Sequence, residues 1–118
     1  MQQCSLRTSV SQVRNLLIVN LPFPLSDAML NDLADQLRER LVKRSCRGVI
    51  IDLTAVALVD YGAFQAIENI ARCNQVFGAT TTLVGLQAGV ALYLAQCPFD
   101  FGLMRFARTM EKALQMHE

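Results

Sequence analysis

Three short apolar runs stand out along the chain, at residues 15–20, 49–53 and 79–84. Each is too short for a stable helix and lacks the apolar-polar alternation of a strand with one wet face. Such continuous apolar runs are typical of strands that are buried on both sides of a sheet. Two weaker segments, residues 6–10 and 103–106, are expected to add an edge strand and a further short strand.

The segments between these runs have the period of an α-helix. Ser26 and Asp60 are suited to cap the first and second helices, and Gly78 is expected to end the second. Two further helices are predicted at residues 88–96 and 107–116. The apolar stripe of the first helix recurs at intervals of three and four residues and comprises Met29, Leu30, Leu33, Leu37, Leu41 and Val42, with Gly48 just beyond its end.

Strands that alternate with helices predict parallel β-α-β crossovers, and therefore an α/β fold. The first two strands are separated by too few residues for a crossover, so they are expected to pair as an antiparallel hairpin. The result is a mixed central sheet of about four to five strands with about four helices packed on it. A chain of 118 residues has the usual size of one domain, and residues 1–118 are expected to form a single domain.

Charge and composition exclude several classes of function. Eleven basic and ten acidic side chains leave a net charge of +1, with no basic run that suits nucleic acid. The N-terminus lacks the features of a secretory signal, and no apolar run reaches bilayer length, so we expect a cytoplasmic location without membrane insertion. Four scattered cysteines and a single histidine, His117, predict no metal site.

The motifs of common catalytic and cofactor sites are missing from the sequence. There is no Walker lysine loop and no Gly-x-Gly-x-x-Gly, and residues 85–89 lack both the spacing and the cation. No Gly-x-Ser-x-Gly elbow occurs, and one terminal histidine leaves no evident general base. Asp52 and Asp60 could form an acid-base pair, but a strand-ending carboxylate and a helix cap explain them more simply. We therefore expect no catalytic residues and no cofactor.

Four segments together resemble the STAS family, and most of all its RsbS-type stressosome scaffolds and anti-sigma-factor antagonists. They are residues 48–54 (GVIIDLT), 59–63 (VDYGA), 78–79 (GA) and 83–87 (LVGLQ). In the family, an apolar strand ends in an Asp-Leu-Thr-like turn, an Asp-Ser pair opens the next helix, and a later strand ends in a Thr-Gly-Ile-Gln-like turn. The resemblance extends over roughly residues 15–97, and it implies the STAS fold.

The resemblance implies a non-catalytic signalling module that a serine kinase switches by phosphorylating the Ser beside the Asp. Asp60 matches the Asp, but Tyr61 stands where the family has its phosphoacceptor Ser. The implied partners are homologous STAS or sensor subunits, a switch-type serine kinase or an anti-sigma factor, in a homo- or hetero-oligomer.

The partner-binding surface is expected at the start of the second helix, with the turn after the third apolar run beside it. Its predicted residues are Asp60, Tyr61, Gly62, Phe64, Gly85 and Gln87. Tyr61 has two interpretations: an interface anchor that holds the domain in one binding state, or a cover for the first helical turn.

Two other functions remain open at this point. One is a small α/β protein that binds a nucleotide or flavin at the carboxyl ends of the strands, where open sheets usually hold ligands. The other, which the resemblance allows, is a STAS subunit of a membrane transport complex.

Overall fold

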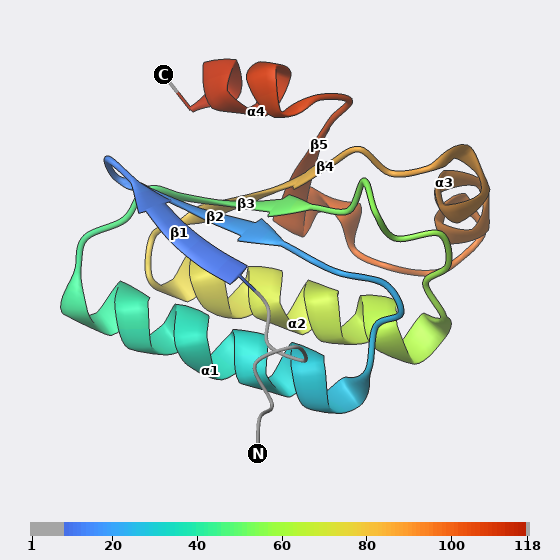
Figure 1. The fold of residues 1–118 in the computed structure, drawn as a ribbon, viewed down its shortest axis with the longest axis horizontal. Helices are drawn as coiled ribbons and strands as arrows, with labels where there is room; N and C mark the ends of the chain where they lie inside the picture. Colours follow the sequence, from blue (N-terminus) through green and yellow to red (C-terminus); the bar gives the residue numbers. More distant parts are fainter. Residues whose placement is uncertain (1–8, 118) are drawn as a thin grey trace.

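The computed structural model describes residues 9–117, and these form a five-stranded sheet flanked by helices (Figure 1). The strands lie in the order of the sequence, and only the first pair is antiparallel. The sequence prediction of a mixed α/β sheet with an N-terminal hairpin is therefore confirmed. The strands are β1 (Ser9–Val13), β2 (Leu16–Asn20), β3 (Gly48–Asp52), β4 (Thr80–Val84) and β5 (Met104–Ala107).

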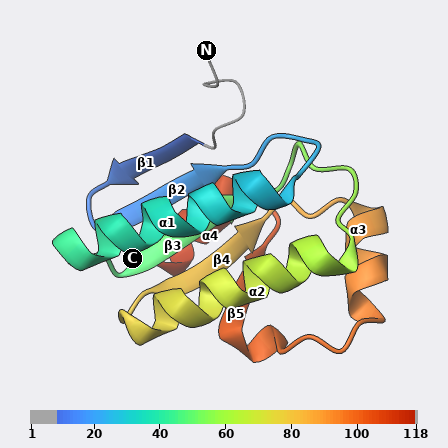
Figure 2. The same ribbon diagram turned by 90° about the horizontal axis from the view of Figure 1, so that it is seen from below.

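The helices cover the two faces of the sheet unequally. Two long helices lie side by side on one face, a short one lies on the opposite face, and another lies at the carboxyl ends of the parallel strands (Figures 1 and 2). In chain order they are α1 (Asp27–Lys43), α2 (Tyr61–Val76), α3 (Ala88–Ala95) and α4 (Met110–Met116), with a 3₁₀ turn η2 (Phe101–Leu103) before β5.

The core explains why the strands are apolar throughout. Alternate side chains of β2 and β3, such as Val19 and Ile51, are buried against α1 and α2. The intervening side chains Leu16 and Ile50 are buried on the other face, where they pack with Ala113 of α4. Central strands of this sheet thus have no wet face, as the continuous apolar runs predicted.

Local capping signals are confirmed at both long helices. The Ser26 hydroxyl accepts a hydrogen bond from the Met29 N–H at 3.1 Å, and the Asp60 carboxylate accepts one from the Ala63 N–H at 2.7 Å. Gly78 follows Phe77, the C-cap residue of α2, and has a positive φ of 84°, the left-handed conformation that glycine adopts most easily.

Three boundaries differ from the sequence prediction. The edge strand runs over Ser9–Val13 and not over residues 6–10, of which residues 6–8 lie outside the described part of the chain. Gly48 begins β3 instead of trailing the first helix. The last helix begins at Met110, because Ala107 belongs to β5 and the Thr109 side chain caps the helix by accepting from the Lys112 N–H.

Candidate functional site

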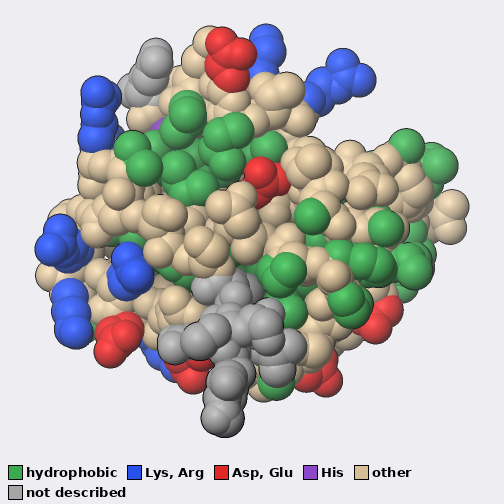
Figure 3. Space-filling model, viewed as in Figure 1, with side chains coloured by type: hydrophobic (Ala, Val, Ile, Leu, Met, Phe, Trp, Pro, Cys, Tyr) green, Lys and Arg blue, Asp and Glu red, His purple; other side chains and the backbone are tan. Residues whose placement is uncertain are grey.

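An apolar groove opens at the carboxyl ends of the parallel strands. It has a volume of about 580 Å³ and is formed by three segments: the loop after β2, the loop between β3 and α2, and the first turns of α3. Figure 3 shows hydrophobic side chains gathered at this end of the molecule. The residues that line the groove are Phe23, Pro24, Leu25, Ala57, Leu58, Val59, Asp60, Ala63, Gly89, Val90 and Tyr93.

Asp60 is the one charged residue among those that line the groove. Its carboxylate is held at the N-terminus of α2 by the bond from the Ala63 N–H, where the helix dipole favours a negative charge. Desolvation raises the pKa of the Tyr93 phenol, which lines the same groove, above its usual 10.0. Cys97 and the negative charge of Asp60 raise this pKa further. The groove thus combines apolar walls with one anionic group.

Tyr61 lies beside the groove as the first residue of α2. Its ring stays 45% exposed, and its inner face packs on Phe99 with ring centroids 5.0 Å apart. Phe99 in turn contacts Phe64 edge-on at 4.7 Å. Tyr61 therefore both covers an aromatic cluster and presents an amphipathic surface, so the geometry is compatible with either interpretation of this residue.

The prediction that Phe64 contributes to the partner surface is wrong. Its side chain is 0% exposed, because the apolar face of α2 turns it into the core between the sheet and η2. Phe64 supports Tyr61 indirectly, through Phe99. Gly62, by contrast, is exposed, and a Cβ on it would meet nothing nearer than the Asp60 carboxylate at 3.7 Å, so no close contact requires glycine there.

Gly85 and Gln87 lie on the turn between β4 and α3, beside the groove but outside its lining. Gly85 has a φ of 73°, and a Cβ on it would lie 2.2 Å from the Thr54 hydroxyl. The Gln87 amide donates to the Thr54 carbonyl at 3.0 Å. The two residues therefore brace the loop that follows β3, and they position the groove wall instead of forming it.

Within residues 9–117, no hydrogen bond joins Asp52 to Asp60, so the two do not form an acid-base pair. The Asp52 carboxylate accepts a hydrogen bond from the Thr54 N–H at 2.9 Å and so shapes the turn after β3. Asp60 caps α2. Both residues therefore have the simpler structural role that the sequence favoured.

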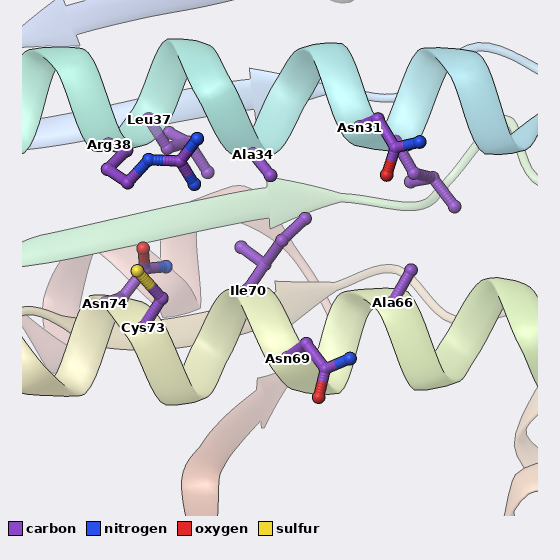
Figure 4. Close-up of a pocket in the computed structure, with 10 residues that line it drawn as sticks. Asn31, Ala34, Leu37, Arg38, Ala66, Asn69, Ile70, Cys73 and Asn74 are labelled. Atoms are coloured by element: carbon purple, nitrogen blue, oxygen red, sulfur yellow. The ribbon is translucent and has the colours of Figure 1, made fainter.

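Sequence reasoning missed the apolar residues that contribute most to the groove. Leu58 is 70% exposed in the loop before α2, and Phe23 and Tyr93 face it from the other two segments. The available signal was the run of apolar residues at 55–59 in a loop, where polar residues are usual. A second, smaller hollow of about 190 Å³ lies between α1 and α2 (Figure 4) and was not anticipated either.

The described residues contain no group of three or more His, Cys, Asp or Glu side chains suited to a metal ion. None of the helices within residues 9–117 is both long and apolar enough to cross a bilayer. The groove lining contains no lysine or arginine that would pair with a phosphate.

The fold and the site together define an α/β module with an exposed apolar groove at the carboxyl ends of its parallel strands. The STAS-domain family model matches residues 7–113, and the chain belongs to the STAS family. No protein with a curated description matches the sequence.

Solved structures show the same fold at low sequence identity. A serine-to-glutamate variant of RsbS from Moorella thermoacetica superposes with a TM-score of 0.81 and 21% identity, covering 92% of each chain. A chain of the stressosome, described as a signal integration and transduction hub, superposes with a TM-score of 0.79 and 22% sequence identity. The match covers 92% of this chain and 94% of the stressosome chain. The anti-sigma factor antagonist SpoIIAA in its unphosphorylated form superposes with a TM-score of 0.72 and 12% sequence identity. The match covers 93% of this chain and 96% of SpoIIAA.

A membrane protein also contains this fold as one of its parts. The murine anion transporter Slc26a9 matches 90% of this chain with a TM-score of 0.74 and 15% identity, but the match covers only 18% of the transporter. These identities show a shared fold and leave the biological role of this chain to be argued from its own surface.

Proposed function

We propose that this chain is a non-catalytic signalling or scaffold module of a bacterial partner-switching system, of the stressosome or anti-anti-sigma type, that works in the cytoplasm. One observation carries the proposal: large apolar side chains are exposed together around the N-terminus of α2. We call this the docking surface; it comprises Phe23, Leu58, Asp60, Tyr61 and Tyr93. Apolar patches of this kind, with polar groups at the rim, mark protein interaction sites.

The partners we propose are proteins of three kinds: homologous STAS or sensor subunits, a switch-type serine kinase, and an anti-sigma factor. Membership of the STAS family and the fold shared with RsbS and SpoIIAA support this choice. Tyrosine and phenylalanine rings are enriched in interface cores, and the docking surface exposes rings of both kinds.

Tyr61 gives the proposed module one fixed binding state. A serine at this position would gain about two negative charges on phosphorylation next to Asp60, which would repel an acidic partner surface. Tyr61 instead holds its ring against Phe99 at the same place. Thr81 and Thr82 are fully buried, so they do not replace the missing serine hydroxyl on the docking surface.

The groove favours a protein segment over a nucleotide or flavin. Tight phosphate binding usually uses cationic side chains, and the lining has none, since its one charged residue is the carboxylate Asp60. Its remaining side chains suit apolar anchors of a partner.

The test is native mass spectrometry of the chain co-expressed with the STAS, sensor and kinase proteins that neighbouring genes encode. We expect a stable complex with at least one of them, and Leu58→Asp should weaken it by about tenfold or more, since it places a charge in an apolar contact. Val76→Asp is the matched control, because Val76 is 82% exposed at the far end of α2.

Two results would contradict the proposal. One is a protein that ignores these neighbours and carries a bound nucleotide or flavin, which the same spectrum would reveal as added mass. The other is a complex that Leu58→Asp and Val76→Asp weaken equally, because the docking surface would then have no special role.

A further inference from the structure

The outer side of β5 is an open edge of the sheet, on the side opposite to β1 (Figure 2). β5 is the last strand in the sheet order and pairs only with β4. The outward backbone groups of such a strand are left for water or for a further strand. This edge shares no residue with the lining of the apolar groove, so it is separate from the docking surface.

The register of β5 determines which of its backbone groups point outward. The Ala107 carbonyl accepts a hydrogen bond from the Gly85 N–H at 3.1 Å, so Ala107 directs its polar groups toward β4. Successive residues of a strand direct these groups to opposite sides, and Phe106 therefore directs its N–H and C=O outward. Within residues 9–117, neither group of Phe106 bonds to anything beyond the sheet. An added strand would bond to both of them.

The two faces of β5 differ in chemistry beside this edge. Ala107 points to the face that α4 covers, where it packs with the cluster that contains Ala113. Arg105, two residues earlier, is exposed on the same face. Phe106 points to the opposite face, where its ring is 41% exposed and its centroid lies 5.9 Å from that of Phe101. One face of the edge is therefore basic and the other is aromatic.

A basic hollow of about 380 Å³ lies between the end of β5 and α4. Its lining contains two cations and no carboxylate, and Arg105 adds a third positive charge on the α4 side of the strand. None of these three cations forms an ion pair within residues 9–117. The residues that line the hollow are Phe106, Ala107, Arg108, Lys112, Gln115 and Met116.

We infer that the β5 edge binds an extended acidic segment of a partner protein, which adds to the sheet as a further strand beside β5. Alternate side chains of the added strand then point to the two faces. Its carboxylates lie toward Arg105, Arg108 and Lys112, and its apolar side chains lie toward the rings of Phe101 and Phe106. The edge therefore recognises an alternation of acidic and apolar residues.

The cations favour this occupant over a second copy of the chain. Two β5 edges paired about a twofold axis would bring the three cations of one copy close to those of the other. Like charges across a strand pair are destabilising, whereas an acidic strand makes each of these interactions attractive. The partner that the charges fit is thus an acidic segment, and the docking surface stays free when it binds.

Fluorescence anisotropy with three labelled peptides tests the binding at low salt, where charge interactions are least screened. The first peptide alternates glutamate and valine. The second replaces each glutamate by lysine, and the third keeps the side chains of the first but is N-methylated along its backbone, so it cannot donate backbone hydrogen bonds. We expect only the first peptide to bind, because it alone has both the charge and the backbone donors.

Charge reversal in the hollow tests the role of the cations. Arg108→Glu and Lys112→Glu should each weaken binding of the glutamate-valine peptide by about fivefold or more, and the double variant should bind the lysine-valine peptide instead. Arg44→Glu is the matched control, because it makes the same change of charge at an exposed position, the C-cap of α1. We expect no change in peptide binding from this control.

Hydrogen exchange of the Phe106 amide, followed by NMR, tests the strand pairing directly. The bound glutamate-valine peptide should slow this exchange by about tenfold or more, because the outward N–H gains a partner. The Ala107 amide should change little, since the register already places it in the ladder with β4.

Four results would overturn the inference. They are a glutamate-valine peptide that does not bind up to millimolar concentration, an N-methylated peptide that binds equally well, equal weakening by Arg44→Glu and Lys112→Glu, and loss of binding in Leu58→Asp, which would place the peptide on the docking surface. Phosphatidylserine vesicles that bind the chain and displace the peptide would also contradict it, because a membrane surface would then be the occupant.

Discussion

The ring of Tyr61 lies against the ring of Phe99, with centroids 5.0 Å apart and planes inclined by 32°. Tyr61 begins α2 and Phe99 precedes η2, so the contact joins two segments that are far apart in the sequence. It places a half-exposed aromatic side chain where relatives in the family are expected to have a phosphoacceptor serine. Tyr61 therefore belongs both to the aromatic packing at the start of α2 and to the docking surface that we propose.

Tyr61→Ser is expected to lower the free energy of unfolding by about 1 kcal/mol, because it removes this aromatic pair and exposes Phe99 to water. Urea unfolding followed by circular dichroism measures the change. Tyr61→Phe keeps the ring and should leave stability nearly unchanged. Equal losses in both variants would mean that the hydroxyl, and not the ring contact, stabilises this region.

His117 is expected to make the fold less stable in mild acid. Its Nε2 lies 2.9 Å from the Thr82 hydroxyl, and desolvation, followed by the positive charge of Arg105, lowers its pKa below the usual 6.5. A lowered pKa means that the folded state prefers neutral imidazole, so stability is complete above pH 6.5 and declines as the pH falls from there toward the pKa of the folded state.

This pH dependence can be measured without ambiguity, because His117 is the one histidine of the chain. An NMR titration of its ring should give a pKa below 6.5, and a value at or above 6.5 would contradict the prediction. His117→Gln should lose less stability than the unmodified chain between about pH 8 and about pH 5, since it cannot be protonated in that range.

Gly48→Ala is expected to destabilise the fold by about 1–3 kcal/mol through overpacking. A Cβ on Gly48 would lie 2.5 Å from the His117 ring and 2.9 Å from the Leu16 side chain. In the double variant with His117→Ala the cost should be smaller, because one of the two clashes is gone. Gly62→Ala is the control and should be neutral or slightly stabilising, since no atom lies closer than 3.7 Å.

Thr81→Val is expected to cost about 1–3 kcal/mol, because it leaves the buried Asn74 amide without its hydrogen bond. The Asn74 side chain donates to the Thr81 hydroxyl at 2.8 Å, and both residues are almost completely buried. The double variant Asn74→Ala and Thr81→Val should lose less than the sum of the single losses in urea unfolding. Strict additivity would show that the two side chains do not depend on each other.

Much of the fold was predictable because its signals are local. The period of α1, the caps at Ser26 and Asp60, and the apolar runs of β2, β3 and β4 all depend on residues a few positions apart. The boundaries of β1 and α4 were less accurate. Both are short elements at the ends of the chain, and their limits depend on pairing with β2 and on packing against the sheet.

The candidate site was only partly predictable. Asp60, Tyr61 and Gly62 lie at the exposed start of α2, as expected from the motif. Phe64 was misplaced because a motif gives no information about which side of a helix faces the core. The groove lining at Phe23, Leu58 and Tyr93 was missed because loops have no period, so nothing local indicates which of them meet in space.

By itself, the sequence determined the α/β class, the order of the elements and the position of the family motif, since backbone preferences, capping and hydrophobic period act over short distances. Tertiary structure alone decided how three loops form one groove, that Tyr61 rests on Phe99, and that His117 packs beside Gly48. These contacts join residues that are distant in the chain. Chain folding brings them together only when the sheet and its helices bury their shared apolar surface.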